Sequence, residues 1–78
     1  MAGKPRPKPC YLDSFEAWKI IGGQKVWRNH DGSRLYTWDG LHGEIEVFNA
    51  RGHHLGVLDA VDGQVTKQAV KGRKIDVK

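Results

Sequence analysis

Turn signals at near-regular spacing constrain the fold of this chain most strongly. From Lys25 onward, short segments in which apolar and polar residues alternate are separated by Asp-Gly and other Asn- or Gly-containing turns. Successive side chains of a strand point to opposite faces, so this alternation predicts half-buried strands joined by tight connections. The fold class expected is α+β, mostly β, with about five strands in one small, highly twisted antiparallel sheet. The predicted strands cover 25–29, 34–38, 42–48, 54–59 and 64–70.

One short helix is expected ahead of this sheet. Asp13 and Glu16 have the spacing of a capping box, and a Gly-Gly pair stops the apolar run that follows. These signals predict a helix over 14–21, with Trp18 packing it onto the sheet.

The N-terminal segment differs in composition from the rest of the chain. Residues 1–11 hold all three prolines, interleaved with lysine and arginine, and little apolar content. Such a segment favours extended backbone, so we expect a flexible basic linker at 1–11 and the folded domain at 12–78.

Composition limits the classes of protein to consider. A chain of 78 residues forms one small domain with a thin core, which makes an open groove more plausible than a deep pocket. Its single cysteine, Cys10, excludes an internal disulfide. No apolar run approaches the roughly 18 residues of a membrane span, and no signal peptide is visible. The net charge of +4 and the pI near 9.5 suit a polyanionic partner such as a nucleic acid.

Chemistry-bearing residues concentrate in 36–48, YTWDGLHGEIEVF. Alternation along a strand places His42, Glu44 and Glu46 on one face, and Asp39 on the preceding turn could approach His42 from the side. An imidazole and carboxylates on one face could act as general acid and base on a phosphodiester. The ordinary interpretation is a solvated polar face of a sheet, which is the commoner use of such a strand.

A second signal is the basic C-terminal tail. Five of the thirteen Lys and Arg residues lie in the last twelve positions, and the tail could add an edge strand or cross the surface. Such a run is usually a solvated edge that discourages strand addition, but beside the carboxylate face it would bind phosphate. The five are Lys67, Lys71, Arg73, Lys74 and Lys78.

Further residues have two interpretations each. Tyr36 and Trp38 share a face and could stack on RNA bases or pack in the core. His54, at the start of a strand, is expected to face the site and touch RNA. His53 and His54 show no spacing typical of a zinc or two-metal site, so no metal ligand is predicted.

The residues quoted so far resemble a known family. The string RLYTWDGLHGEIEVF, followed by HHLGVLD, DGQ and a basic tail, is similar to the C-terminal nuclease domain of the ribosome-inactivating colicins and cloacin. The same domain forms the toxic tip of some pyocins and contact-dependent growth inhibition proteins. The resemblance covers about Trp27 to Arg73, and its core motif, Y-x-W-D-x-x-H-G-E-x-E, is specific. The loop 49–53 is one residue shorter than in the colicins.

The resemblance implies a metal-independent endoribonuclease without a cofactor. It would cut 16S ribosomal RNA at the decoding centre of the bacterial small subunit and so stop translation. The implied partners are that ribosomal subunit and a small acidic immunity protein. Delivery would be as part of a larger secreted or cell-surface toxin that acts in the cytoplasm of the target cell.

The resemblance also implies roles for individual residues. Asp39, His42, Glu46 and Arg73 match the catalytic positions, and Glu44 matches a supporting acidic neighbour. RNA supplies its own nucleophile, the 2′-OH, so we assign Glu46 as base and His42 as acid, with Asp39 orienting His42 and Arg73 on the phosphate. Tyr36, Trp38, Lys67, Lys71 and Lys74 are the expected RNA contacts.

Two other classes fit the residues without the resemblance. A non-catalytic RNA-binding module would bind RNA without cutting it. A protein-interaction domain would show no salt-dependent affinity for RNA.

Overall fold

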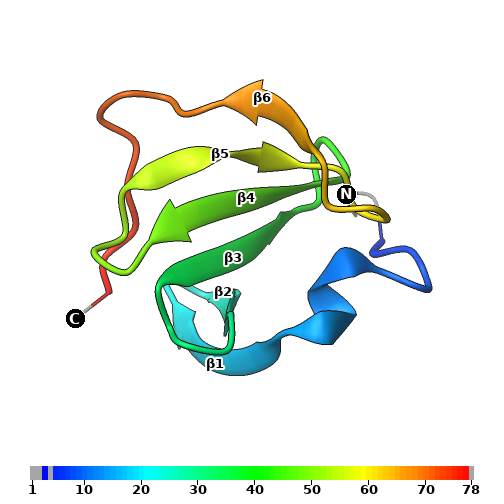
Figure 1. Ribbon diagram of the computed structural model, residues 1–78, viewed down its shortest axis with the longest axis horizontal. Helices are drawn as coiled ribbons and strands as arrows, with labels where there is room; N and C mark the ends of the chain where they lie inside the picture. The colour runs from blue at the N-terminus through cyan, green and yellow to red at the C-terminus, as the bar shows by residue number, and fades with distance from the viewer. Residues whose placement is uncertain (1–2, 4, 78) are drawn as a thin grey trace.

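One antiparallel sheet forms the body of the protein. The computed structural model describes residues 3 and 5–77, and its six strands lie in sequence order, so each strand pairs with the next along the chain (Figure 1). The prediction of a mostly β, antiparallel fold is confirmed, but there are six strands rather than about five. They are β1 Glu16–Ile21, β2 Gln24–Arg28, β3 Arg34–Asp39, β4 Glu44–Asn49, β5 His54–Leu58 and β6 Val65–Gln68.

The helix expected over 14–21 is wrong. A single 3-10 turn, η1 Tyr11–Ser14, is followed after Phe15 by β1. Asp13 does not cap a helix that begins after it, because its carboxylate accepts the backbone N–H of Cys10 at 3.0 Å and closes the preceding turn instead.

The glycine pair that was expected to end a helix is a hairpin turn. Gly22 and Gly23 have φ of 58° and 79°, a left-handed conformation that two-residue hairpins require. They join β1 to β2, and Ile21 pairs with Gln24 across the turn. β1 is also rich in aromatic and β-branched residues, which suit a strand better than a helix.

The sheet buries apolar side chains on both faces. Trp27, Tyr36, Ile45, Val47 and Leu58 belong to a cluster on one face, which also includes Cys10 and Leu12. A smaller cluster on the other face contains Val26, Leu35 and Phe48; Trp18, Ile21, Ile75 and Val77 pack against it. Trp18 thus packs onto the sheet as predicted, although from a strand.

The C-terminal tail lies across the surface and adds no named strand among the described residues. In Figure 1 it runs, orange to red, past the start of β5 and the end of β4. The Arg73 carbonyl accepts the N–H of His54 at 3.0 Å, and Ile75 donates its N–H to the Gly52 carbonyl at 2.8 Å. Lys19 holds the end of the tail through the Val77 carbonyl at 2.9 Å. These bonds bring the tail arginine to the polar side of β4.

Within residues 3 and 5–77, no helix has the length and apolar character needed to cross a bilayer.

Candidate active site

The turn between β3 and β4 is built around Asp39. Its Oδ1 accepts the backbone N–H groups of Leu41 at 3.1 Å and His42 at 3.2 Å, and its carbonyl accepts that of Gly43 at 2.7 Å. Asp59 organises the turn after β5 in the same way, with bonds to the two residues that follow Ala60. The fold therefore uses this type of turn twice. The turn at Asp39 differs in having a histidine, His42, at its fourth position.

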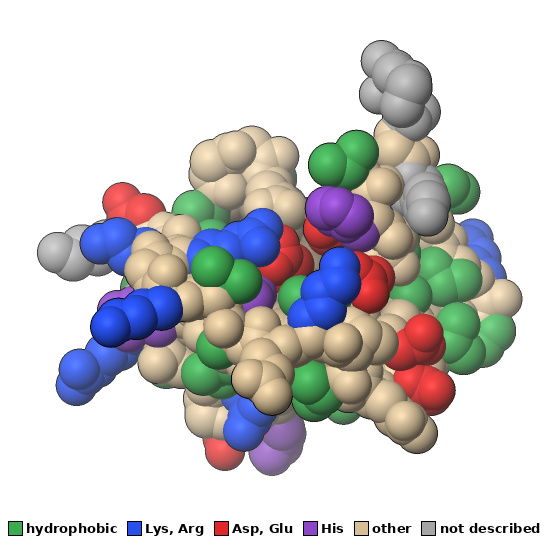
Figure 2. Space-filling model, turned by 90° about the horizontal axis from the view of Figure 1, so that it is seen from above, with side chains coloured by type: hydrophobic (Ala, Val, Ile, Leu, Met, Phe, Trp, Pro, Cys, Tyr) green, Lys and Arg blue, Asp and Glu red, His purple; other side chains and the backbone are tan. Residues whose placement is uncertain are grey.

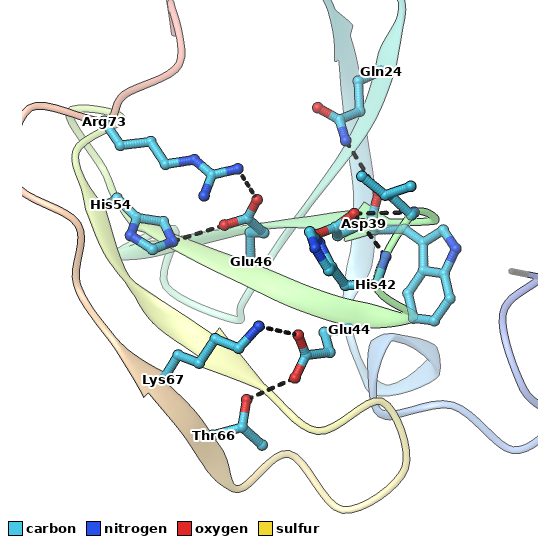
Figure 3. Close-up of polar contacts among 11 residues, drawn as sticks. Gln24, Asp39, His42, Glu44, Glu46, His54, Thr66, Lys67 and Arg73 are labelled. Atoms are coloured by element: carbon cyan, nitrogen blue, oxygen red, sulfur yellow. Dashed lines mark hydrogen bonds and ion pairs between the residues drawn. The ribbon is translucent and has the colours of Figure 1, made fainter. Parts of the chain in front are cut away.

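The alternation had predicted that His42 lies on the strand. It lies in this turn instead. β4 begins only at Glu44, because Gly43 has a φ of 70° and interrupts the extended backbone. The turn nevertheless brings the imidazole to the same side of the sheet as Glu46 (Figure 3).

Asp39 and His42 form a hydrogen-bonded pair, which confirms the expected approach from the side. His42 Nδ1 lies 2.7 Å from Asp39 Oδ2. Partial burial raises the pKa of Asp39, but hydrogen bonds from the ring and backbone of His42 outweigh it and hold that pKa below its ordinary value. The charged carboxylate can only accept, so Nδ1 carries the proton and Nε2 is the ring nitrogen left for a ligand. More than half of the His42 side chain is exposed.

Glu46 is the buried carboxylate of the site. It is 5% exposed and receives a donor on each oxygen. Oε1 lies 2.8 Å from Nε2 of His54, and Oε2 pairs with Nη2 of Arg73, so the glutamate sits between the two (Figure 3). Burial of a carboxylate is costly unless it is paired and hydrogen-bonded, and both partners meet that need here.

The protonation of His54 follows from its second partner. Its Nδ1 lies 2.9 Å from the backbone N–H of Val70, which can only donate. Nδ1 is therefore the acceptor, and Nε2 carries the single proton and donates it to Glu46. The side chain of His54 has no exposed surface, so the expected contact with RNA is wrong: it supports Glu46 from behind.

Asp39, His42, Glu46 and Arg73 line one open hollow of about 310 Å³. Figure 2 shows acidic and histidine side chains near the middle of this face with Lys and Arg side chains beside them. The hollow thus exposes an imidazole nitrogen, a carboxylate and a guanidinium to one bound group. Its lining consists of Gln24, Thr37, Trp38, Asp39, Gly40, Leu41, His42, Glu46, Phe48, Arg73, Lys74 and Ile75.

Glu44 belongs to a separate pair beside this hollow. Its carboxylate accepts Lys67 Nζ at 3.0 Å and the Thr66 hydroxyl at 3.1 Å. The bond from Lys67 is the main reason why the pKa of Glu44 lies below its ordinary value; burial opposes this shift, and the Thr66 bond adds to it. Lys67 is therefore engaged with a carboxylate, whereas Lys71 and Lys74 lie exposed on the tail.

The two aromatic candidates have different positions. Tyr36 is 4% exposed and stacks on Phe15 with ring centroids 4.3 Å apart; burial raises the pKa of its hydroxyl. It is a core residue, so base stacking is the wrong one of its two interpretations. Trp38 is partly buried, packs against the same core cluster and also lines the hollow.

Two polar side chains of the lining were not among the candidates. Thr37 is buried and is the cross-strand partner of Glu46, a position that the predicted β3–β4 pairing could have identified. Gln24 donates its side-chain N–H to the Trp38 carbonyl at 3.1 Å. No pattern in the sequence distinguishes this glutamine from other polar residues at the start of a strand.

Metal ligands are not gathered in the part of the chain that the structure describes: no three His, Cys, Asp or Glu side chains there are arranged to hold an ion. Metal independence stays a prediction.

Comparison with known proteins yields two matches. The family model described as Cytotoxic matches residues 13–76. Colicin E3 from Escherichia coli is 40% identical over 47 residues, which are 59% of this chain and 8% of colicin E3. The chain therefore corresponds to a small part of that relative's length.

Proposed function

Because the chain belongs to the Cytotoxic domain family, that of the colicin-type ribonucleases, we propose that it is the RNA-cleaving domain of a bacterial toxin. The observation that carries the proposal is one hollow holding the Asp39–His42 pair and the Glu46–Arg73 pair. A base, an acid and a cation are the groups that cleavage of RNA by its own 2′-OH needs.

Glu46 is the proposed base. Arg73 and His54 occupy its two oxygens in the free protein. When a phosphate enters the hollow, Arg73 turns from Oε2 to the non-bridging oxygens, because a guanidinium binds phosphate through paired N–H groups. Oε2 is then free to take the 2′-OH proton, while His54 still holds Oε1. Arg73 thus has two successive partners, the base before substrate binds and the phosphate afterwards.

His42 is the proposed acid. Asp39 holds Nδ1 at 2.7 Å, so a protonated ring presents Nε2–H to the hollow. That proton goes to the departing 5′ oxygen, and the products are a 2′,3′-cyclic phosphate and a 5′-hydroxyl. The step uses no metal ion, because Arg73 supplies the positive charge on the phosphate.

The proposed substrate is 16S ribosomal RNA at the decoding centre. A hollow of about 310 Å³ is too small to read a long sequence. Specificity must then come from how the ribosome presents one exposed site, since RNA recognition depends mainly on shape, unstacked bases and phosphates.

The experiment is to incubate the domain with intact bacterial ribosomes in excess EDTA and to map the small-subunit RNA by primer extension. The His42→Ala protein is the control. A single stop near the decoding centre, lost in the variant, is the expected result. Cleavage that requires added metal would refute the metal-free mechanism, and intact RNA would refute the enzyme.

The partners follow from the same family. We propose that a small acidic immunity protein covers this basic domain, whose formal charge of +4 would favour the encounter. The parent toxin would be secreted or displayed on the cell surface and deliver the domain to the cytoplasm of a competing cell.

The second candidate is an RNA-binding module without catalysis. The exposed lysines of the tail favour it, because they suit phosphate contacts whether or not the strand is cut. It predicts salt-dependent binding of ribosomal RNA and no new RNA ends.

A further inference from the structure

A second hollow lies on the other side of Arg73. It measures about 390 Å³ and is formed by the start of β5, the segment after β6 and the tail. We call the hollow that holds Asp39, His42 and Glu46 the catalytic hollow. Arg73 and Lys74 line both hollows, so the two are neighbours on the surface and share a cationic wall. We call it the basic hollow. Its lining consists of His53, His54, Ala69, Val70, Lys71, Gly72, Arg73 and Lys74.

Its charge differs from that of the catalytic hollow. The lining contains three Lys or Arg residues and no carboxylate, whereas Asp39 and Glu46 lie in the catalytic hollow. Among the described residues, no ion pair joins Lys71 or Lys74 to a carboxylate, in contrast to Lys67 with Glu44. Exposed cations without internal partners are free to bind an anion, and little attraction must be broken first.

The backbone beneath these cations is held in place at several points. Val70 donates its N–H to the buried His54 ring at 2.9 Å and accepts the N–H of Arg73 at 3.2 Å, which closes a turn around Gly72. His53 forms an isolated bridge with Lys74 on the other side. The exposed side chains of Lys71, Lys74 and His53 therefore project from a fixed frame that also carries the catalytic arginine.

We propose that the basic hollow binds a backbone phosphate of the RNA strand that flanks the scissile phosphate, with Lys71, Lys74 and the ring of His53 as its contacts. The inference rests on the proposed function, because it places the same strand across Arg73 from one hollow to the other. The contact is to phosphate and not to a base, so it positions the strand without selecting a sequence.

The test uses a single-stranded RNA oligonucleotide and the His42→Ala protein, so that binding is measured without cutting. Lys71→Ala in that background is expected to weaken binding several-fold and to lower the slope of log K against log salt by about 0.7, the value for one phosphate contact on a single strand. Lys25→Ala is the matched control, since Lys25 lies over the Trp27 ring and outside both hollows. It is expected to leave the slope unchanged.

A second set of oligonucleotides locates the contact. Each carries one uncharged methylphosphonate linkage at a successive position. One flanking linkage is expected to weaken binding, and at that linkage Lys71→Ala is expected to cost nothing more, because both changes remove the same contact.

An unchanged salt slope, or additive losses at every linkage, would overturn the phosphate site. Binding that behaves as expected, together with intact ribosomal RNA in the cleavage assay, would remove the enzyme and leave this site standing.

Discussion

Replacement of His54 tests how the buried glutamate is held. The histidine makes two bonds of different kind, a donation to the Glu46 carboxylate at 2.8 Å and an acceptance from the Val70 N–H at 2.9 Å. Glutamine reproduces the donor at the Nε2 position and loses the acceptor. Asparagine reproduces the acceptor at the Nδ1 position and loses the donor. The two variants therefore remove one bond each from the same buried site.

The magnitudes follow from those bonds. A hydrogen bond to a charged group contributes about 1.5–3 kcal/mol and a neutral one about 0.5–1.5 kcal/mol. We therefore expect the free energy of unfolding to fall by about 0.5–1.5 kcal/mol in His54→Gln and by about 1.5–3 kcal/mol in His54→Asn. For a domain of this size each kcal/mol corresponds to a change of about 4–8 °C in Tm. The asparagine variant should also lose more activity, because it leaves the proposed base without its fixed partner.

Thermal unfolding followed by circular dichroism gives the stabilities, and cleavage of ribosomal RNA at equal folded fraction gives the activities. A His54→Gln protein less stable than the His54→Asn protein would refute the assignment of the proton to Nε2. Equal activities in the two variants would refute the positioning role of His54.

Three further predictions concern the position of the tail, the Glu44 carboxylate and the stability of the protein in acid. Gly52→Ala should lower the free energy of unfolding by about 1–2 kcal/mol for its left-handed backbone alone. It should also reduce cleavage, because the new Cβ would overlap a tail carbonyl and displace Arg73. Gly22→Ala, which has open space around it, should lose stability only. Glu44→Gln should lower the free energy of unfolding by about 1 kcal/mol or less, as for other near-surface ion pairs, and a loss of several kcal/mol in denaturant titrations would contradict this. Asp39 has a lowered pKa, so its stabilising effect should be present above the ordinary aspartate pKa of about 3.9 and be lost as pH falls through the folded value; stability curves of Asp39→Asn and the unaltered protein should converge in acid, and a constant gap would count against it.

The strands were predictable because their signal is local. Alternation and turn residues located all five strands from β2 to β6 within a few residues. The N-terminal helix was wrong for the opposite reason: capping-box spacing and an apolar face are also compatible with a strand whose partner lies across a glycine hairpin. Pairing with β2 favours the strand over the helix, and this pairing cannot be predicted from the sequence of the segment alone.

The candidate site was predictable where neighbours in sequence are neighbours in space. Asp39 and His42 are three residues apart, and the Asx-type turn that joins them could be anticipated. The partners of Glu46 come from 8 and 27 residues away, so the burial of His54 and its bond to Val70 had no local signal. Arg73 was predicted only through the family resemblance, and the packing of the tail explains how it comes to lie beside Glu46.

The chemistry of the new RNA ends tests the central proposal most directly. Ribosomal RNA cut by the domain should carry a 2′,3′-cyclic phosphate upstream and a 5′-hydroxyl downstream of the break, because the 2′-OH is the nucleophile and His42 protonates the 5′ oxygen. Resistance of the upstream end to phosphatase until acid opens the ring, and direct labelling of the downstream end by polynucleotide kinase, would report this pair. A 5′-phosphate with a 3′-hydroxyl would mean attack by water, and it would contradict the roles assigned to Glu46, His42 and Arg73.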